Sequence, residues 1–164
     1  MMQTPGAIDA GREAGRDFAR ARRGAFFRRM LGRLAQRRRG GVRAGSAGRL
    51  ACFGEAREAL GEALRVRRGL QTVELGRISG SVGRCLNFDG GFLPACSCTR
   101  DRWERVDRAS REGKFLPPVE LYKLGQDYFV ADGNHRVSVA RYRGGVAVDA
   151  VVTEFLAPCG CPFA

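Results

Sequence analysis

Residues 117–155 decide the fold, and they read PPVELYKLGQDYFVADGNHRVSVARYRGGVAVDAVVTEF. Their first half alternates apolar and polar residues on both sides of a turn at residues 125–127, which predicts a β-hairpin. A helix is predicted over residues 135–143, where two glycines end it, and a closing strand over residues 146–155. This order of hairpin, helix and strand indicates an α+β domain.

Four polar residues and a glycine lie where the hairpin meets the helix: Asp132, Gly133, Asn134, His135 and Arg136. The start of a helix leaves backbone N–H groups unpaired and carries a partial positive charge, so it binds anions. Gly133 lets a ligand approach the backbone, and His135 and Arg136 add donors beside the same point. Asp132 is a candidate catalytic group, because it can orient a donor, bind a metal held by phosphates or accept a proton. The turn thus predicts a phosphate site, unless Asp132 and Asn134 only cap the helix while Arg136 pairs with a surface acid.

The chain before the hairpin gives weaker signals. A helix is predicted over residues 53–66 and a short strand over residues 72–75. The Gly/Ser-rich residues 78–84 are typical of a loop and end in an arginine. Residues 85–98 have no clear period and predict a long surface loop, and a further helix is predicted over residues 101–112.

The N-terminal arm, residues 1–50, carries most of the charge. The chain has 164 residues and a formal net charge of +12, of which +10 belongs to the arm, with 13 Arg against 3 Asp or Glu. Residues 1–15 predict a frayed end, whereas residues 16–39 predict a helix, followed by a glycine-rich connector over residues 40–49. The apolar face of this helix comprises Phe27, Met30, Leu31 and Leu34.

Arginines fill most of the remaining surface of that helix. Such a basic amphipathic helix can dock on the core, lie on a membrane or touch a phosphate backbone. We expect weak, salt-dependent binding of DNA or another polyanion, and the rival interpretation is a helix that packs on the domain with its arginines in solvent. The arginines assigned to polyanion binding are Arg20, Arg22, Arg23, Arg28, Arg29, Arg37, Arg38 and Arg39.

Composition places further limits on the protein. The six cysteines include two C-x-C pairs, Cys96 with Cys98 and Cys159 with Cys161, which together could supply four thiolates to zinc. The spacing within each pair is narrower than in most structural zinc sites, so no structural metal is expected. No run approaches the roughly 20 apolar residues of a membrane span, and no secretion signal is visible. Mostly reduced thiols in a cytoplasmic protein are therefore expected.

The chain divides into four predicted segments. Residues 1–50 form the basic arm with its connector, and residues 51–71 a helical lead-in. Residues 72–157 form the α+β domain, and residues 158–164 a cysteine-containing tail.

Residues 72–155 resemble the ParB/sulfiredoxin superfamily, in the opening strand VELGRI and in the hairpin, phosphate-binding turn, helix and closing strand quoted above. The resemblance implies a small mixed sheet with packed helices, here preceded by the basic helical arm. It also implies that a nucleoside di- or triphosphate (CTP, ATP or ADP), with Mg²⁺, binds at the turn. Arg84 matches an arginine that ParB proteins place after their first strand. The residues implied to bind the phosphates are Gly133, Asn134, His135, Arg136 and Arg84.

Members of this superfamily differ at the turn. ParB proteins carry Gly-Glu-Arg-Arg at this turn, and this chain has Asn134 in place of the glutamate. Sulfiredoxins carry Gly-Cys-His-Arg, and this chain has Asn134 in place of the nucleophilic cysteine. Sulfiredoxin activity is therefore not expected. Free-serine kinases of this fold carry Asp-Gly-His-His-Arg, which is similar to residues 132–136 at four of five positions. We expect a nucleotide-binding protein with a regulatory or DNA-associated role. The alternative is a small-molecule kinase or phosphotransferase, for which Glu74 and Asp107 are further candidate catalytic carboxylates. A nuclease is the third and least favoured hypothesis.

Overall fold

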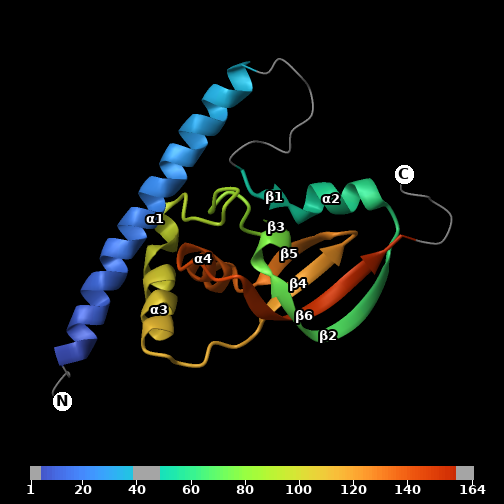
Figure 1. Cartoon of the computed structure of the whole chain (residues 1–164). Coiled ribbons are helices and arrows are strands. Elements are labelled where there is room, and N and C mark those ends of the chain that lie inside the picture. Colours follow the sequence, from blue (N-terminus) through green and yellow to red (C-terminus); the bar gives the residue numbers. More distant parts are fainter. Residues whose placement is uncertain (1–4, 39–48, 158–164) are drawn as a thin grey trace.

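The computed structural model describes residues 5–38 and 49–157. One six-stranded mixed sheet forms its centre, with the strand order β1-β3-β5-β4-β6-β2, and α-helices pack around it (Figure 1). The strands are β1 (Ala51–Cys52), β2 (Leu64–Glu74), β3 (Ile78–Ser81), β4 (Val119–Leu124), β5 (Asp127–Asp132) and β6 (Ala147–Leu156). The helices are α1 (Pro5–Arg38), α2 (Phe53–Leu60), α3 (Arg100–Arg111) and α4 (Asn134–Tyr142), with short 3-10 helices η1 (Leu75–Arg77) and η2 (Ser97–Thr99).

Helices cover both faces of the sheet. On one face, α4 packs its buried Val137 with Val130 of β5 in the main core. On the other face, Phe53 of α2 packs against Phe129 and Phe155, with ring centroids 5.4 and 5.2 Å apart. Side chains alternate between the two faces along a strand, so the neighbours Phe129 and Val130 serve different cores.

The elements predicted from residues 117–155 are present. β4 and β5 form an antiparallel hairpin in which Leu124 lies opposite Asp127. Gly125 begins the turn with φ +61°, a left-handed conformation that glycine adopts without steric cost. α4 begins one residue before the predicted helix, and β6 pairs with both β4 and β2. The predicted α+β class is confirmed at the level of a mixed sheet with packed helices.

Two predictions for the chain before residue 78 are wrong. The helix predicted over residues 53–66 ends at Leu60, because residues 64–74 form β2. β2 is longer than the strand predicted over residues 72–75, since it pairs antiparallel with the whole of β6, from Leu64 opposite Leu156 to Glu74 opposite Ala147. The arginines of β2 obscure the alternation of apolar and polar residues that would predict a strand. Pairing with β6 sets the register of β2.

The loop predicted over residues 78–84 contains a central strand instead. β3 lies between β1 and β5 and pairs in parallel with both. Gly80 explains the loop-like composition: a Cβ atom there would lie 2.4 Å from the Ala51 carbonyl oxygen and 2.6 Å from the Phe129 ring. A glycine in a strand commonly marks such a close approach.

Residues 85–98 are not a surface loop. Phe88 and Phe92 are fully buried in the main core. The segment closes on Asp89, whose Oδ1 accepts hydrogen bonds from the backbone N–H groups of Gly91 (3.0 Å) and Leu93 (2.7 Å). This carboxylate satisfies the backbone of the turn, so two phenylalanines can enter the core without regular secondary structure.

α1 is longer than predicted and docks through a different face. Residues 5–15 are helical rather than frayed, since α1 begins at Pro5. Phe18 contacts Trp103 of α3 edge to face, with ring centroids 5.7 Å apart. The buried face comprises Ala14, Phe18, Ala21 and Ala25, whereas Phe27, Met30 and Leu31 of the predicted face are exposed. The side chains of Leu34, Arg37 and Arg38, together with Arg39 and most of the connector, lie outside the described residues.

Four cysteines form disulfides, which corrects the expectation of mostly reduced thiols. Cys52 of β1 is bonded to Cys85, with a Cα–Cα distance of 5.4 Å, and Cys96 is bonded to Cys98. The second bond makes the sulfurs of the first C-x-C pair unavailable as thiolates for zinc. The tail that carries the other C-x-C pair, residues 158–164, lies outside the described residues.

Candidate anion-binding site

A cavity of about 580 Å³ lies at the start of α4. It gathers the five residues assigned from the sequence to the phosphate site together with Asp132, and it includes Arg84, which lies far from the turn in the chain. α3 and the segment before β4 complete its walls. The lining residues are Gly83, Arg84, Arg102, Val106, Leu116, Pro117, Ala131, Asp132, Gly133, Asn134, His135 and Arg136.

The backbone at Gly133 sets the shape of the cavity floor. Gly133 is the residue that precedes α4 and has φ +97°, in the left-handed region. A Cβ atom there would lie 2.6 Å from Val119 Cγ1. Within the described chain, no side chain caps the start of α4. The interpretation of Asp132 and Asn134 as simple helix caps is therefore wrong, and the first N–H groups of α4 have no side-chain acceptor.

Asn134 and His135 place buried polar atoms beside this helix start. Their residues are 7% and 8% exposed, respectively. Among the residues that the structure describes, Asn134 Oδ1 and His135 Nε2 have no hydrogen-bond partner. Buried polar atoms almost always have a partner, and an unsatisfied one costs about 1–3 kcal/mol. Both residues line the cavity, so a small movement of either side chain would bring its unsatisfied atom to a ligand there.

His135 is held in its neutral form. Burial, followed by the positive charges of Arg102 and Arg84, lowers the pKa of His135 to about 4 from its ordinary 6.5, and Asp132 opposes the shift. The imidazole ring contacts Phe88 edge to face, with ring centroids 5.5 Å apart. A neutral imidazole donates from one nitrogen and accepts at the other, so His135 is a hydrogen-bonding group here rather than a cation.

Arg136 is anchored to the protein as well as lining the cavity. Its guanidinium donates to the carbonyl oxygens of Pro117 and Pro118 (2.8 Å for Pro118) and forms an ion pair with Asp132. The pairing of Arg136 with an acid, part of the rival interpretation, is thus confirmed. Arg136 fixes the segment before β4 against the turn, and Asp132 is occupied by this ion pair.

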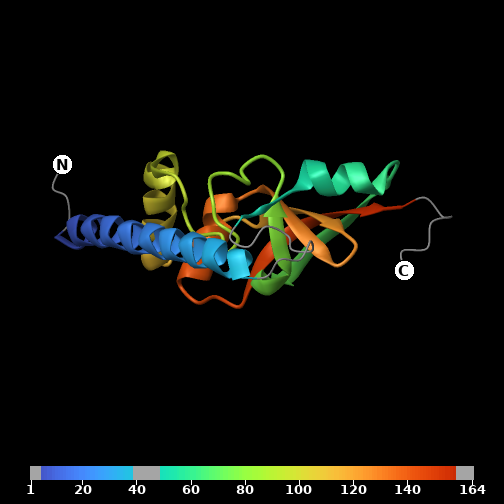
Figure 2. The same cartoon turned by 90° about the horizontal axis from the view of Figure 1, so that it is seen from above.

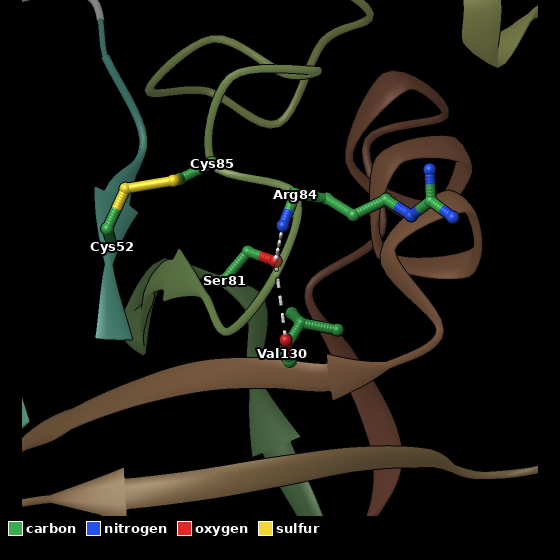
Figure 3. Close-up of a disulfide and its surroundings, with 5 residues drawn as sticks. All are labelled: Cys52, Ser81, Arg84, Cys85 and Val130. Atoms are coloured by element: carbon green, nitrogen blue, oxygen red, sulfur yellow. Dashed lines mark hydrogen bonds between the residues drawn. A yellow bond between two sulfur atoms is a disulfide. The ribbon is translucent and has the colours of Figure 1, made fainter. Parts of the chain in front are cut away.

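Arg84 is held in place through its backbone. Its N–H donates to Ser81 Oγ (3.1 Å), and the Ser81 hydroxyl donates to the Val130 carbonyl oxygen (3.4 Å). The next residue, Cys85, is bonded to Cys52 of the edge strand (Figure 3). The Arg84 side chain points away from the disulfide (Figure 3), toward the cavity that it lines.

Arg102 is a site residue that the sequence did not reveal. It lies in the first turn of α3 and reaches the cavity because α3 packs beside α4. Its sequence neighbourhood resembles any exposed helix start, so only the tertiary packing identifies it. With Arg84 and Arg136 it gives the cavity three guanidinium groups against one carboxylate, Asp132.

The two other candidate carboxylates do not belong to the site. Asp107 is fully buried and accepts hydrogen bonds from Arg143 (2.8 and 2.9 Å) and Arg111 (3.1 Å), so it joins α3 to α4. Glu74 is exposed at the end of β2, opposite Ala147. The prediction that either residue is catalytic has no support from their positions.

Comparisons with protein-family models, curated proteins and solved structures find no match for this chain. No α-helix in residues 5–38 and 49–157 has the length and apolar character needed to cross a membrane. In the same part of the chain, no group of three or more His, Cys, Asp or Glu residues is arranged to hold a metal ion.

Proposed function

We propose that this protein binds a nucleoside di- or triphosphate, with its phosphates at the start of α4. The observation that carries the proposal is the pair of buried polar atoms, Asn134 Oδ1 and His135 Nε2, beside a positively charged cavity. A hydroxyl or amine of the nucleoside can donate to Asn134 Oδ1, a phosphate oxygen can accept from His135 Nε2, and the phosphate charge complements the excess of arginine.

The phosphate contacts follow from the helix start. The first intrahelical bond of α4 runs from the Val137 N–H to the Gly133 carbonyl, so the N–H groups of residues 134–136 are free of helical acceptors. Arg84 and Arg102 supply exposed guanidinium forks, which suit phosphate oxygens. His135 donates from Nε2 when its proton resides there.

The remaining walls suit the nucleoside. Val106, Leu116 and Pro117 give an apolar side to the cavity, and Asn134 Oδ1 can accept a hydrogen bond from a ribose hydroxyl or a base amine. The cavity volume of about 580 Å³ falls within the range of sites for small molecules and cofactors. Mg²⁺ binds mainly through nucleotide phosphates and few protein carboxylates, and it would reach Asp132 only on release of the Arg136 ion pair.

A binding role, regulatory or DNA-associated, is proposed ahead of catalysis. Asp132 is the one carboxylate among the described residues of the cavity, and Arg136 already pairs with it. A kinase or phosphotransferase role would therefore depend on release of this ion pair. No cysteine is among the described lining residues, and Asn134 occupies the position of the sulfiredoxin nucleophile, so sulfiredoxin chemistry is not proposed. The cytoplasmic location stays a prediction.

Calorimetry with CTP, ATP, ADP and GTP tests the proposal. Arg84→Gln and Arg102→Gln should each weaken binding by about 1.5–3 kcal/mol, the usual loss for a hydrogen bond to a charged group. Arg105→Gln is the matched control, because Arg105 is exposed on α3 and does not line the cavity. Absence of binding of all four nucleotides to folded wild-type protein would overturn the proposal. Release of phosphate from a bound nucleotide, abolished by Asp132→Asn, would replace it with the phosphotransferase alternative.

A further inference from the structure

α1 carries a second apolar surface that the domain does not cover. Four large side chains in its C-terminal half are exposed: Phe26 (65%), Phe27 (55%), Met30 (42%) and Leu31 (61%). We call these four residues the outer face. At about 100° per residue, they project opposite to the docked face formed by Ala14, Phe18, Ala21 and Ala25.

The charge around the outer face has one sign. Between Asp17 and Glu55 the sequence contains no acidic residue, whereas eight arginines lie between residues 18 and 38. Arg22 and Arg23 are exposed beside the outer face. A helix that combines exposed aromatic and aliphatic side chains with flanking arginines has the composition of a helix that lies in the plane of a membrane.

Contacts on both sides of its middle hold α1 on the domain while leaving its outer face free. In its N-terminal half, Asp17 pairs with Arg111 and accepts a hydrogen bond from the Tyr142 hydroxyl (2.9 Å). Further along, Arg28 lies 3.8 Å from the buried carboxylate of Asp89. α1 runs along the outside of α3, and its C-terminal half extends beyond α3 (Figures 1 and 2).

We propose that the C-terminal half of α1 binds an anionic lipid surface. The helix lies parallel to the surface, Phe26, Phe27, Met30 and Leu31 enter the boundary between headgroups and acyl chains, and the neighbouring arginines contact lipid phosphates. The outer and docked faces are opposite, so a flat surface reaches the first without disturbing the second. This proposal does not depend on the nucleotide site.

Two other occupants fit the outer face less well. A second copy of the chain would bring two helices together that each carry eight arginines and no acid over residues 18–38, and like charges disfavour that contact. A nucleic acid would use the arginines, but the phosphate backbone offers no apolar partner for Met30 and Leu31. An anionic lipid surface satisfies both the charge and the apolar side chains.

Flotation of the full chain with lipid vesicles tests this proposal. Wild-type protein should float with vesicles of phosphatidylcholine and phosphatidylglycerol and should float poorly with vesicles of phosphatidylcholine alone. Phe26→Gln with Phe27→Gln should reduce partitioning at least about tenfold, because two apolar anchors are lost while the charge is kept. Arg22→Gln with Arg23→Gln should reduce partitioning into the anionic vesicles by up to about thirtyfold, because each arginine near an anionic surface contributes about tenfold or less.

Exposed apolar residues elsewhere supply the control. Phe115 and Val146 are 86% and 79% exposed and lie far from α1 in sequence, so Phe115→Gln with Val146→Gln should float as the wild type does. Circular dichroism and nucleotide binding should be unchanged in every variant, which separates this test from that of the nucleotide site.

Three results would overturn the lipid proposal. The first is equal flotation of the wild type and the Phe26/Phe27 variant. The second is retention of duplex DNA without flotation, which would assign the arm to nucleic acid. The third is a dimer in solution that the Phe26/Phe27 substitutions dissociate while wild-type protein ignores vesicles, which would assign the outer face to a second copy of the chain.

Discussion

The start of α4 and the C-terminal half of α1 both carry positive charge, but the first lies in a polar cavity and the second on an apolar, convex surface. At α4 the charge lines a cavity with two buried polar atoms, Asn134 Oδ1 and His135 Nε2, that lack partners among the described residues. On α1 the charge flanks exposed apolar side chains on a convex helix surface. A concave polar site suits a small anion that fits its donors, whereas a convex apolar and basic face suits an extended anionic surface. Arginine content alone therefore does not identify the partner.

Removal of the Cys52–Cys85 disulfide should have the largest effect and should separate the two regions. The bond closes a loop of 33 residues, and Cys52→Ser with Cys85→Ser should lower the free energy of unfolding by about 3–4 kcal/mol, measured with urea. The same variant should weaken nucleotide binding, because Arg84 precedes Cys85, and should leave vesicle binding unchanged. Cys96→Ser with Cys98→Ser is the control, since its bond joins residues only two apart. An equal loss of stability in both variants would contradict the prediction.

Gly133→Ala should destabilise the site somewhat less. The left-handed φ of +97° costs an alanine about 1–2 kcal/mol, and the new methyl group would meet Val119, which adds about 1–3 kcal/mol. We expect a total of about 3 kcal/mol in urea unfolding, together with loss of nucleotide binding.

Gly144→Ala is the matched control for this prediction. Gly144 also has a positive φ, +75°, but among the described residues other than its chain neighbours no atom lies within 4 Å of the position of its Cβ. This change should cost about 1–2 kcal/mol. If Gly133→Ala lowers the free energy of unfolding no more than Gly144→Ala does, contact with Val119 does not define the turn.

The sequence predicted the turn at residues 132–136 because the geometry of that region is local. A hairpin, a glycine and a helix start lie next to one another in the chain, so their arrangement needs no distant partner. Arg102 joins the site only through the packing of α3 beside α4, and no local pattern indicates it. Arg84 was assigned through a resemblance, and its place is set by Ser81 and by the disulfide.

The sequence does not reveal the docked face of α1, because that face consists mainly of small residues. Alanines give a weak apolar signal, so Phe27, Met30 and Leu31 dominated the pattern although Ala21 and Ala25 are buried. Small residues allow helices to pack closely. A pattern of large apolar side chains therefore does not indicate a helix face that is buried through its alanines. Gly80 gives a misleading signal for the same reason, since its lack of a side chain is what the close approach of β1 and Phe129 requires.

The pKa of His135 sets the sign of the pH dependence. In the folded protein this pKa is about 4, below the 6.5 of the unfolded chain, so the unfolded state binds more protons between these values. The contribution of His135 to stability should therefore be greatest above pH 6.5 and fall as the pH decreases toward 4, by about 1.5 kcal/mol between pH 6.5 and 5. His135→Gln should remove this part of the pH dependence of urea unfolding.

Titration of His135 by NMR tests the account most directly, because it is the only histidine in the chain and its imidazole signals need no assignment. Without ligand, the signals should titrate with a pKa of about 4. Saturating nucleotide should raise that pKa by about one unit or more, since phosphate charge beside the ring offsets Arg84 and Arg102. Nucleotide binding that leaves both the shifts and the pKa of His135 unchanged would place the ligand elsewhere and contradict a phosphate site at the start of α4.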